Sequence, residues 1–572
     1  MVQISKKLIV KRQSDSINAE NINISQHIVL AEYYCINKDY GKGLKIYKKI
    51  LPLLEEEEKR KIISKYTEFS LHYAGILFKE KKYTEAIKIY KNLMEYQNFP
   101  LCIYKNLGIC MKLTGNPDEA IKFLKQFEKL SPNKEDVYVY LADITYEDFK
   151  DNKKAIEYYE KALKTIKNNF AIYNMLGHLY STEYQDKFKE KQIEYLTKAF
   201  ELAPQNRIVV KNLAYVYGKF HETKNADEFY AKLMKLNPLH SDLHSYGAYL
   251  VQHKHFTEGF KFLRHRFKKE DLKQNSFPEI FKNEKKCWDI KTDIQDKYII
   301  VHYEQGFGDS IMFVRFVKQL KSLCKKVSVV VQDGLVELFK DSDLGVDIYT
   351  EKEFKNINYD YCIPMMDLPV ICKTTPITIP LSKGYLKVPA KAVKAYREKY
   401  INNNKKFKIG IAYEGTISSK ETDRDIPLEF LYPLMQLPNV EVYSFQVDDI
   451  NHQMDKVPKE YNFIRLGHTF RNWKDTAAAM KNMDLIVTTD NGVMNLAGAL
   501  GVKTFGLFNI ITEWRWFQTT GENIVWYASV KPFQCPTSKA WNIPVNKIVC
   551  EIKKLIKDKK QKTSSKKVTH SV

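Results

Sequence analysis

A repeat with a period near 34 residues, running from about residue 27 to residue 270, constrains this chain more than any other feature. A small residue recurs in the middle of the first helical segment of successive repeats, at Gly75, Gly108, Ala142, Gly177, Ala214 and Gly247. A second small residue recurs in the following segment, and several repeats end in proline, at Ala86, Ala120, Ala155, Ala226 and Gly259, and at Pro132, Pro204 and Pro238. Small residues at this spacing are typical of paired helices that cross closely and stack. We therefore expect an all-α array of about seven repeats.

The residue types at these positions resemble the tetratricopeptide repeat, in which aromatic side chains wedge between the helices. The first repeat, at about 27–52, is degenerate, and we expect the charged segment 55–60 after it to be a spacer. Arrays of this kind form a superhelix with a groove that usually holds peptides or other proteins. The sequence therefore favours binding of a protein partner by the repeats, with a rigid spacer as the alternative.

Length and composition indicate a multidomain protein of ordinary globular character. At 572 residues the chain is too long for one core, and its hydrophobic content of 44% is normal for a water-soluble protein. No apolar run approaches the roughly 18 residues of a membrane span, and the first residues lack the apolar core of a signal peptide. The nine cysteines are scattered without a C-x-x-C pair, which favours reduced thiols over a disulfide frame or a zinc site. We expect a cytoplasmic protein with no bound metal.

The formal net charge of +22 raises the question of nucleic-acid binding. Lysine outnumbers arginine by 80 to 11, whereas arginine is the usual residue for bidentate recognition of bases and phosphates. Dispersed lysine is more typical of a solvated surface, so no nucleic-acid partner is expected. The scarcity of arginine makes the position of each one informative.

From about residue 297 the pattern changes to alternating strands and helices. The segment 297–303 reads as a strand and 310–323 as a helix, and the alternation restarts with a strand at 408–413 after a charged segment at 391–406. Two consecutive series of this kind predict two parallel-sheet domains with a cleft between the carboxyl ends of their strands. One large doubly wound domain is the alternative, and the charged segment argues against it.

The stretch from Val487 to Gly506 reads as a strand, a polar turn, a helix of small residues and a second strand. A turn of this kind presents backbone N–H groups at a helix N-terminus, where a phosphate or pyrophosphate binds. Asp490 stands at the turn, where its side chain either caps the helix or reaches a ribose. A tight connection without any ligand is the alternative.

Four motifs together resemble one bacterial family of glycosyltransferases. They are Glu304-Gln-Gly-Phe-Gly-Asp309-Ser-Ile-Met-Phe-Val-Arg315-Phe, Asp423-Arg424-Asp-Ile-Pro427-Leu, Asp490-Asn-Gly-Val-Met-Asn495-Leu-Ala-Gly-Ala-Leu-Gly501 and Glu513-Trp514-Arg515-Trp516. Members of this family carry tetratricopeptide repeats in front of a heptosyltransferase-like domain of the GT-B type, which has two Rossmann-like halves. The architecture is also similar to that of O-linked N-acetylglucosamine transferases and flagellin glycosyltransferases, in which the repeats recruit a protein acceptor.

The resemblance and the patterns together imply a division of the chain into seven segments. These are an N-terminal extension (1–26), the repeats (27–270), a linker (271–296), the N-terminal Rossmann-like half (297–390), a second linker (391–406), the donor-binding half (407–557) and a basic disordered tail (558–572).

The resemblance implies an inverting, metal-independent glycosyltransferase that uses a nucleotide-sugar as co-substrate and has no cofactor. By similarity to heptosyltransferases, Asp309 is the candidate base for the acceptor hydroxyl, and a helix N-cap is the alternative role. The candidate donor and phosphate contacts are Gly306, Gly308, Arg424, Asp490, Asn491, Gly492 and Asn495. Possible sugar or base contacts are Glu304, Gln305, Trp514, Arg515 and Trp516.

Three of the eleven arginines, Arg315, Arg424 and Arg515, fall within the four motifs, and guanidinium groups suit a diphosphate. A salt bridge on a helix surface is the alternative for Arg315. Asn495 stands where the family usually has a histidine, and its amide still offers one donor and one acceptor. The triplets at 341–343 and 423–425 match the D-x-D pattern of metal-using glycosyltransferases, but a triplet is too short to be specific.

Three functions remain open from the sequence. The first is transfer of a sugar to a protein captured by the repeats, and the second is a catalytically inactive scaffold that retains the fold for protein binding. The third is transfer to a glycan or lipid precursor, with the repeats used for assembly of a complex.

Overall fold

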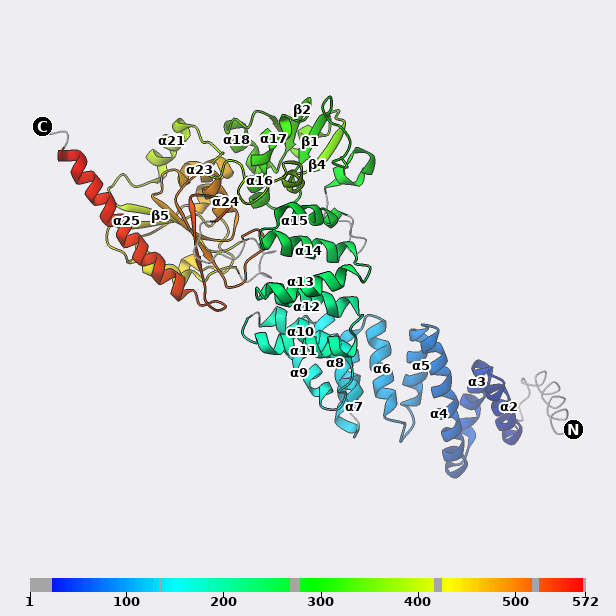
Figure 1. Ribbon diagram of the computed structural model, residues 1–572. Helices are drawn as coiled ribbons and strands as arrows, with labels where there is room; N and C mark the ends of the chain where they lie inside the picture. The colour runs from blue at the N-terminus through cyan, green and yellow to red at the C-terminus, as the bar shows by residue number, and fades with distance from the viewer. Residues whose placement is uncertain are drawn as a thin grey trace. The chain divides into compact units, whose positions relative to one another are not determined.

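The computed structural model describes residues 23–132, 135–184, 186–267, 278–415, 424–516 and 524–568. The chain divides into two compact units, Met1–Glu183 and Tyr184–Val572 (Figure 1). The first 22 residues of the predicted N-terminal extension lie outside the described residues.

The first unit consists of helical hairpins. The helices are α2 (Ile24–Ile36) paired with α3 (Tyr40–Ile50), α4 (Glu56–Lys79) with α5 (Tyr83–Leu93), α6 (Cys102–Leu113) with α7 (Pro117–Leu130), α8 (Glu135–Glu147) with α9 (Asn152–Leu163), and then α10 (Phe170–Glu183). The turns inside the hairpins each contain one residue with positive φ, at Lys38, Lys81, Gly115 and Lys150. The predicted spacer at 55–60 is instead the beginning of α4, because three glutamates in its first turn favour a helix N-terminus.

Close helix crossings explain most of the small residues in the repeat. A Cβ atom on Gly108 would lie 2.6 Å from Cγ of Leu124 and 3.1 Å from the carbonyl oxygen of Ala120 in the next helix. The prediction for Gly75 is wrong, because a Cβ atom there would have no neighbour within 4 Å, whereas the adjacent Ala74 is completely buried. The crossing in this repeat is therefore made by Ala74, which lies 34 residues before Gly108.

Alanine at these two glycines is expected to have opposite effects on stability. Gly108→Ala should lower the free energy of unfolding of the first unit by about 1–3 kcal/mol, because the new methyl group overlaps Leu124. Gly75→Ala should raise it by about 0.5–1 kcal/mol, because alanine favours the helix and nothing obstructs the methyl group. Urea unfolding followed by far-ultraviolet circular dichroism measures both, and equal effects of the two changes would contradict the assignment.

The second unit begins with five more helices of the array. They are α11 (Lys189–Leu202), α12 (Arg207–Lys219), α13 (Thr223–Met234), α14 (His240–Gln252) and α15 (Phe256–Leu263). A Cβ atom on Gly247 in α14 would lie 2.8 Å from the carbonyl oxygen of Gly259 in α15, so this last crossing is also a close one. Within the described residues, α2 to α15 account for the seven predicted repeats, of which the fifth is divided between the two units.

A parallel sheet of four strands follows in the order β3-β2-β1-β4. The strands are β1 (Tyr298–His302), β2 (Lys326–Val330), β3 (Asp347–Tyr349) and β4 (Tyr361–Pro364). The accompanying helices are α16 (Phe307–Phe313), α17 (Val317–Lys321), α18 (Asp333–Asp341), α19 (Glu351–Phe354) and α20 (Leu368–Ile371). The single helix predicted at 310–323 is interrupted by a 3-10 turn, because Arg315 donates to the carbonyl of Met312 at 2.8 Å and competes with the helix for it.

The second sheet has six parallel strands in the order β10-β9-β8-β5-β6-β7. The strands are β5 (Phe407–Ala412), β6 (Val440–Ser444), β7 (Phe463–Arg465), β8 (Leu485–Thr489), β9 (Thr504–Phe508) and β10 (Val530–Gln534). The helices are α21 (Ala390–Tyr400), α22 (Tyr432–Met435), α23 (Trp473–Met480), α24 (Gly492–Ala499) and α25 (Asn542–Val568). The prediction of an α-helical array followed by two parallel-sheet regions is confirmed.

One hydrophobic core joins the last repeat to both sheets. Phe256 and Phe260 of α15 belong to the same buried cluster as Phe313 of α16 and Leu496 of α24. Trp288, in the segment that the sequence suggests as a linker, is buried in this cluster too. The last repeat is therefore part of the α/β region rather than an appendage to it.

The opposite face of the six-stranded sheet is covered by α25, drawn in red in Figure 1, which buries Ile548 and Ile552 beside Trp541, the residue before the helix. The helix continues to Val568, so residues 558–568 are helical where the sequence predicts a disordered tail, and 569–572 lie outside the described residues. Lysine is a good helix former, and a helix already anchored by its buried end propagates easily. Among the described helices, none is both long and apolar enough to cross a membrane.

Candidate active site

The loops that follow β1 and β8 meet through the helices that they begin. Helix α16 follows β1, helix α24 follows β8, and the two helices pack together. A Cβ atom on Gly308 of α16 would lie 2.9 Å from Nδ2 of Asn495 and 3.8 Å from Cα of Gly492 in α24. Gly308 therefore permits a close approach of the two helices, and the carboxyl ends of the two sheets face one another as the sequence predicts.

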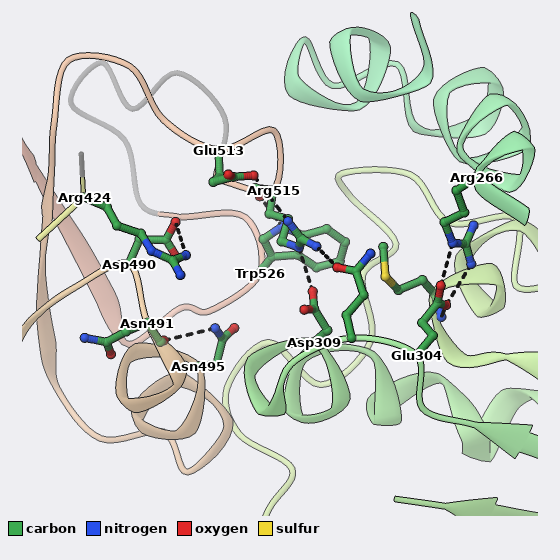
Figure 2. A network of polar contacts seen from close by, with 12 residues as sticks. Arg266, Glu304, Asp309, Arg424, Asp490, Asn491, Asn495, Glu513, Arg515 and Trp526 are labelled. Carbon is green, nitrogen blue, oxygen red and sulfur yellow. Dashed lines mark hydrogen bonds and ion pairs between the residues drawn. The ribbon is translucent and has the colours of Figure 1, made fainter. Parts of the chain in front are cut away.

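Asp309 lies in the first turn of α16 and forms an ion pair across this junction. The guanidinium Nε of Arg515, from the loop after β9, donates to Oδ1 of Asp309 at 2.7 Å (Figure 2). Both side chains are 17% exposed, so the pair is largely removed from water. The N-cap of α16 is Gly306 rather than Asp309, so the alternative role of Asp309 as an N-cap is wrong.

Arg515 also contacts Gln305, Glu513 and Trp514 through its guanidinium. Its Nη2 donates to Oε1 of Gln305 at 2.6 Å, its Nη1 lies 3.4 Å from a carboxylate oxygen of Glu513, and its guanidinium lies 4.4 Å from the ring centre of Trp514. The indole N–H of Trp526 donates to the backbone carbonyl of Arg515 at 2.6 Å. Burial alone would lower the pKa of Arg515, but the neighbouring carboxylates outweigh it and the pKa is raised.

Asp490, at the end of β8, faces Arg424. Nη1 of Arg424 lies 3.7 Å from Oδ2 of Asp490, which is only 9% exposed. Burial raises the pKa of Asp490 to about 6 even though Arg424 opposes the shift. Nε of Arg424, a buried donor in this part of the site, has no hydrogen-bond partner among the described residues, and the indole N–H of Trp516 lies close enough to Asp490 to lower its pKa. Unpaired buried donors beside a cation are suited to an anionic ligand.

The raised pKa of Asp490 predicts a pH-dependent effect of Asp490→Asn. Because the folded pKa of about 6 exceeds the ordinary aspartate pKa of 3.8 in an unfolded chain, the wild-type protein loses stability as the pH rises through this interval. The free energy of unfolding of the variant minus that of the wild type should therefore increase by roughly 3 kcal/mol between about pH 4 and pH 7. Denaturant unfolding at both pH values measures it, and a pH-independent difference would contradict the assignment.

Asn491 occupies the N-terminus of α24 as its N-cap. Its Oδ1 accepts from the backbone N–H groups of Val493 at 2.9 Å and Met494 at 3.3 Å. Two of the N–H groups that the sequence suggests for a phosphate are thus already satisfied by the cap. A phosphate bound at this turn would share or displace that cap.

Asn495 is buried behind the same helix N-terminus. Its amide nitrogen donates to the carbonyl of Asn491 at 3.2 Å, and its amide oxygen accepts from the Tyr527 hydroxyl at 2.9 Å. Both ends of the amide are therefore engaged in holding α24 in place. Asn495, which stands where the family usually has a histidine, therefore has a packing role in this structure.

Glu304 lies away from Arg515 and Asp490, in a buried ion-pair network that joins the last repeat to the first sheet (Figure 2). Arg266 donates from Nε and Nη2 to its two carboxylate oxygens, at 2.6 and 2.8 Å. Arg266 also donates to Asp367 at 2.7 Å, and Arg264 donates to the other oxygen of Asp367 at 2.9 Å. Burial raises the pKa of Glu304, against the opposing effect of Arg266. The possible contact of Glu304 with a sugar or base thus finds its carboxylate fully occupied by Arg266.

Arg315 is buried, so the alternative of a salt bridge on a helix surface is wrong. It is 1% exposed, and its guanidinium lies over the rings of Tyr385 and Tyr527, at 4.5 and 4.6 Å from their centres. It also donates to the backbone carbonyl of Trp526 at 2.6 Å. The guanidinium of Arg315 is therefore buried among residues that surround the site, and it is not available to contact a ligand.

Sequence reasoning missed two contributors, Arg266 and Trp526. Arg266 is one of only eleven arginines, so the scarcity that drew attention to the motif arginines was a signal for it as well. Trp526 is separated from Arg515 by residues that carry no motif, and nothing in the sequence singles it out. The tryptophans within the motif differ, because Trp516 is buried against Phe508 whereas Trp514 is partly exposed and stacks on Arg515.

Among the residues that the structure describes, no group of three or more histidine, cysteine, aspartate or glutamate side chains is arranged to hold a metal ion. Asp341 pairs with Lys474 at 2.8 Å, and Asp423 lies outside the described residues.

Comparison with known proteins finds one family match within the repeats and two distant relatives. Residues 141–169 match the family described as tetratricopeptide repeat. The chain is 21% identical over 283 residues to protein FlbA of Caulobacter vibrioides, which is 46% of this chain and 47% of FlbA. It is 23% identical over 137 residues to the human intraflagellar transport protein 88 homolog, which is 22% of this chain and 16% of that protein. The chain thus spans less than half the length of each of these relatives.

Among solved structures, MamA from Desulfovibrio magneticus is 20% identical, with 30% of this chain and 94% of MamA covered and a TM-score of 0.27. The matched family and the helical hairpins agree on one conclusion. The N-terminal helical region of this chain consists of tetratricopeptide repeats.

Proposed function

We propose that this protein is a glycosyltransferase of the GT-B type that transfers a sugar from a nucleotide-sugar to a protein held by the repeats. The observation that carries the proposal is the junction of the two sheets, where Asp309 of one half lies opposite Arg515, Arg424 and Asp490 of the other. Sheets that meet at the carboxyl ends of their strands bind ligands in the crevice between them.

The chemistry assigned to this junction is a single displacement. The acceptor hydroxyl oxygen attacks the anomeric carbon of the sugar, Asp309 takes the hydroxyl proton, and the bond from that carbon to the diphosphate oxygen breaks. Arg424 and Arg515 supply the positive charge for the leaving diphosphate, and Nε of Arg424 and the indole N–H of Trp516 supply donors. One displacement at the anomeric carbon inverts its configuration, and these residues do so without a metal ion.

A protein acceptor is favoured by the repeats beside the junction. Gln252 of α14 donates to the carbonyl of Thr512 at 3.2 Å, three residues from Arg515. Tyr215 of α12 is 54% exposed, and surrounding protein and the carboxylate of Glu513 raise its pKa. Its exposed ring offers an aromatic contact to a bound peptide.

A catalytically inactive scaffold is the second candidate. It is favoured by the engagement of the Asn495 amide with Tyr527 and by the Asn491 cap, which together occupy the turn assigned to the donor. In this case the repeats bind protein partners and the α/β region binds no nucleotide-sugar. Transfer to a glycan or lipid precursor remains the third candidate from the sequence.

A ligand screen separates these functions. Melting of the full chain is followed with UDP-, GDP-, ADP- and CMP-sugars, because a ligand that binds only the folded state raises the melting temperature. We expect one nucleotide class to stabilise the protein and to be hydrolysed slowly. No stabilisation by any class would favour the scaffold. Mass spectrometry of glycopeptides from cells with and without the gene then distinguishes a protein acceptor from a glycan or lipid.

A further inference from the structure

Arg515 bonds to both halves of the junction. Its own loop belongs to the second half, yet its two shortest hydrogen bonds go to Asp309 and Gln305 of the first half. Oδ1 of Asp309 therefore already accepts a hydrogen bond from this guanidinium. The same guanidinium is close enough to lower the pKa of Asp490.

The backbone of Arg515 is held independently of its side chain. The indole of Trp526 bonds to the Arg515 carbonyl, and Trp526 is completely buried against Phe256 and Phe313. The side chain rests on the partly exposed ring of Trp514, and its bond to Glu513 is the longest of its three polar contacts. The guanidinium can therefore change partners while its loop stays in place.

We propose that Asp309 and the diphosphate of the donor compete for the guanidinium of Arg515, so that donor binding frees Oδ1 of Asp309 for the acceptor hydroxyl. This inference rests on the proposed function and adds an order to it, with donor before acceptor. A diphosphate carries more negative charge than a carboxylate and accepts two parallel guanidinium hydrogen bonds, so it is the stronger competitor.

The competition predicts that removing the charge of Asp309 tightens nucleotide binding. UDP, GDP and ADP are titrated separately into the wild type, Asp309→Asn, Arg515→Gln and the double variant, with calorimetry as the readout. For the nucleotide that binds, we expect Asp309→Asn to lower Kd about fivefold, because the ion pair no longer has to be broken. Arg515→Gln should raise Kd about tenfold or more, because a contact with the diphosphate is lost.

The double variant separates competition from simple repulsion between Asp309 and the nucleotide. Under competition, Asp309→Asn has no further effect on Kd once Arg515 is glutamine, whereas repulsion would tighten binding equally in both backgrounds. Arg515→Met gives the same comparison if glutamine impairs folding, because methionine also removes the charge for which Asp309 and the diphosphate compete. The matched control is Asp347→Asn, which removes an exposed carboxylate paired with Lys326 at the amino end of the same sheet.

The outcomes are distinguishable from failure of the proposed function. If the wild type binds none of the three nucleotides, the competition fails, and the proposed function fails with it if CMP-sugars also leave the melting temperature unchanged. If a nucleotide binds and Asp309→Asn leaves Kd unchanged, weakens binding, or tightens it equally in the Arg515→Gln background, the competition is overturned and the proposed function stands.

Discussion

Asp309→Asn is expected to lower the rate of sugar transfer by about 10²–10⁴-fold while the protein remains folded. Asparagine keeps the size and one hydrogen-bond acceptor of the side chain, so its contact with Arg515 weakens without leaving a cavity. It cannot take a proton from an acceptor hydroxyl near neutral pH. The measurement is release of nucleotide from the donor identified by the screen, with the acceptor present.

Asp347→Asn serves as the control for loss of one carboxylate from the same half of the α/β region. Its ion pair with Lys326 is about half exposed, so activity within about twofold of the wild type is expected. A folded Asp309→Asn protein that transfers sugar at the wild-type rate would remove Asp309 from the chemistry. Tryptophan fluorescence tests the fold, because all six tryptophans lie in the second unit.

Arg266→Met is expected to lower the free energy of unfolding of the second unit by about 3–5 kcal/mol. The change leaves the carboxylates of Glu304 and Asp367 buried without their shared cation, and their side chains are 1% and 3% exposed. Protonation relieves part of this cost, because burial already raises the pKa of Glu304 and loss of Arg266 raises it further. The loss should therefore be smaller at pH 5 than at pH 8.

Denaturant unfolding followed by tryptophan fluorescence measures this loss in the second unit. Arg266→Lys should cause a smaller loss, because it keeps the charge but cannot bridge Glu304 and Asp367 with the geometry of a guanidinium. Arg465→Met is the surface control, since its pair with Asp455 is about half exposed and should contribute less than about 1 kcal/mol. A loss for Arg266→Met no larger than that of this control would show that the buried network does not stabilise the contact between the last repeat and the first sheet.

The elements of the fold could be predicted where a period fixes them. The hairpins follow from small residues repeated near every 34 positions, and strands such as β5 and β8 follow from short apolar runs between turns. The error at Gly75 has a local reason, because two adjacent small residues satisfy the pattern equally and only packing distinguishes them. The prediction of a disordered tail from residue 558 is wrong up to Val568. It rested on the charge of the segment, whereas helix propagation depends on the buried residues that anchor the beginning of α25.

The side-chain contacts of the candidate site could be predicted less well from the sequence, because they join distant residues. Asp309 and Arg515 are 206 positions apart, and the partner of Glu304 is 38 positions upstream in the repeats. Glu304 and Gln305 are neighbours in one motif, yet they have different roles. The Glu304 carboxylate pairs with Arg266 of the last repeat, whereas the Gln305 side chain bonds to Arg515 at the junction of the two sheets. Motif membership alone does not separate these two roles, because they depend on which way each side chain points from the end of β1.

The shared core between the last repeat and the two sheets sets where this protein can be recombined. A chimera that keeps α14 and α15 with the α/β region preserves Phe256, Phe260 and the Arg266 network, whereas a cut at the end of the array exposes them. The boundary between the two compact units, at Glu183 and Tyr184, avoids that damage. Upstream hairpins could thus be added, removed or exchanged to redirect recruitment, while the final pair travels with the domain it supports.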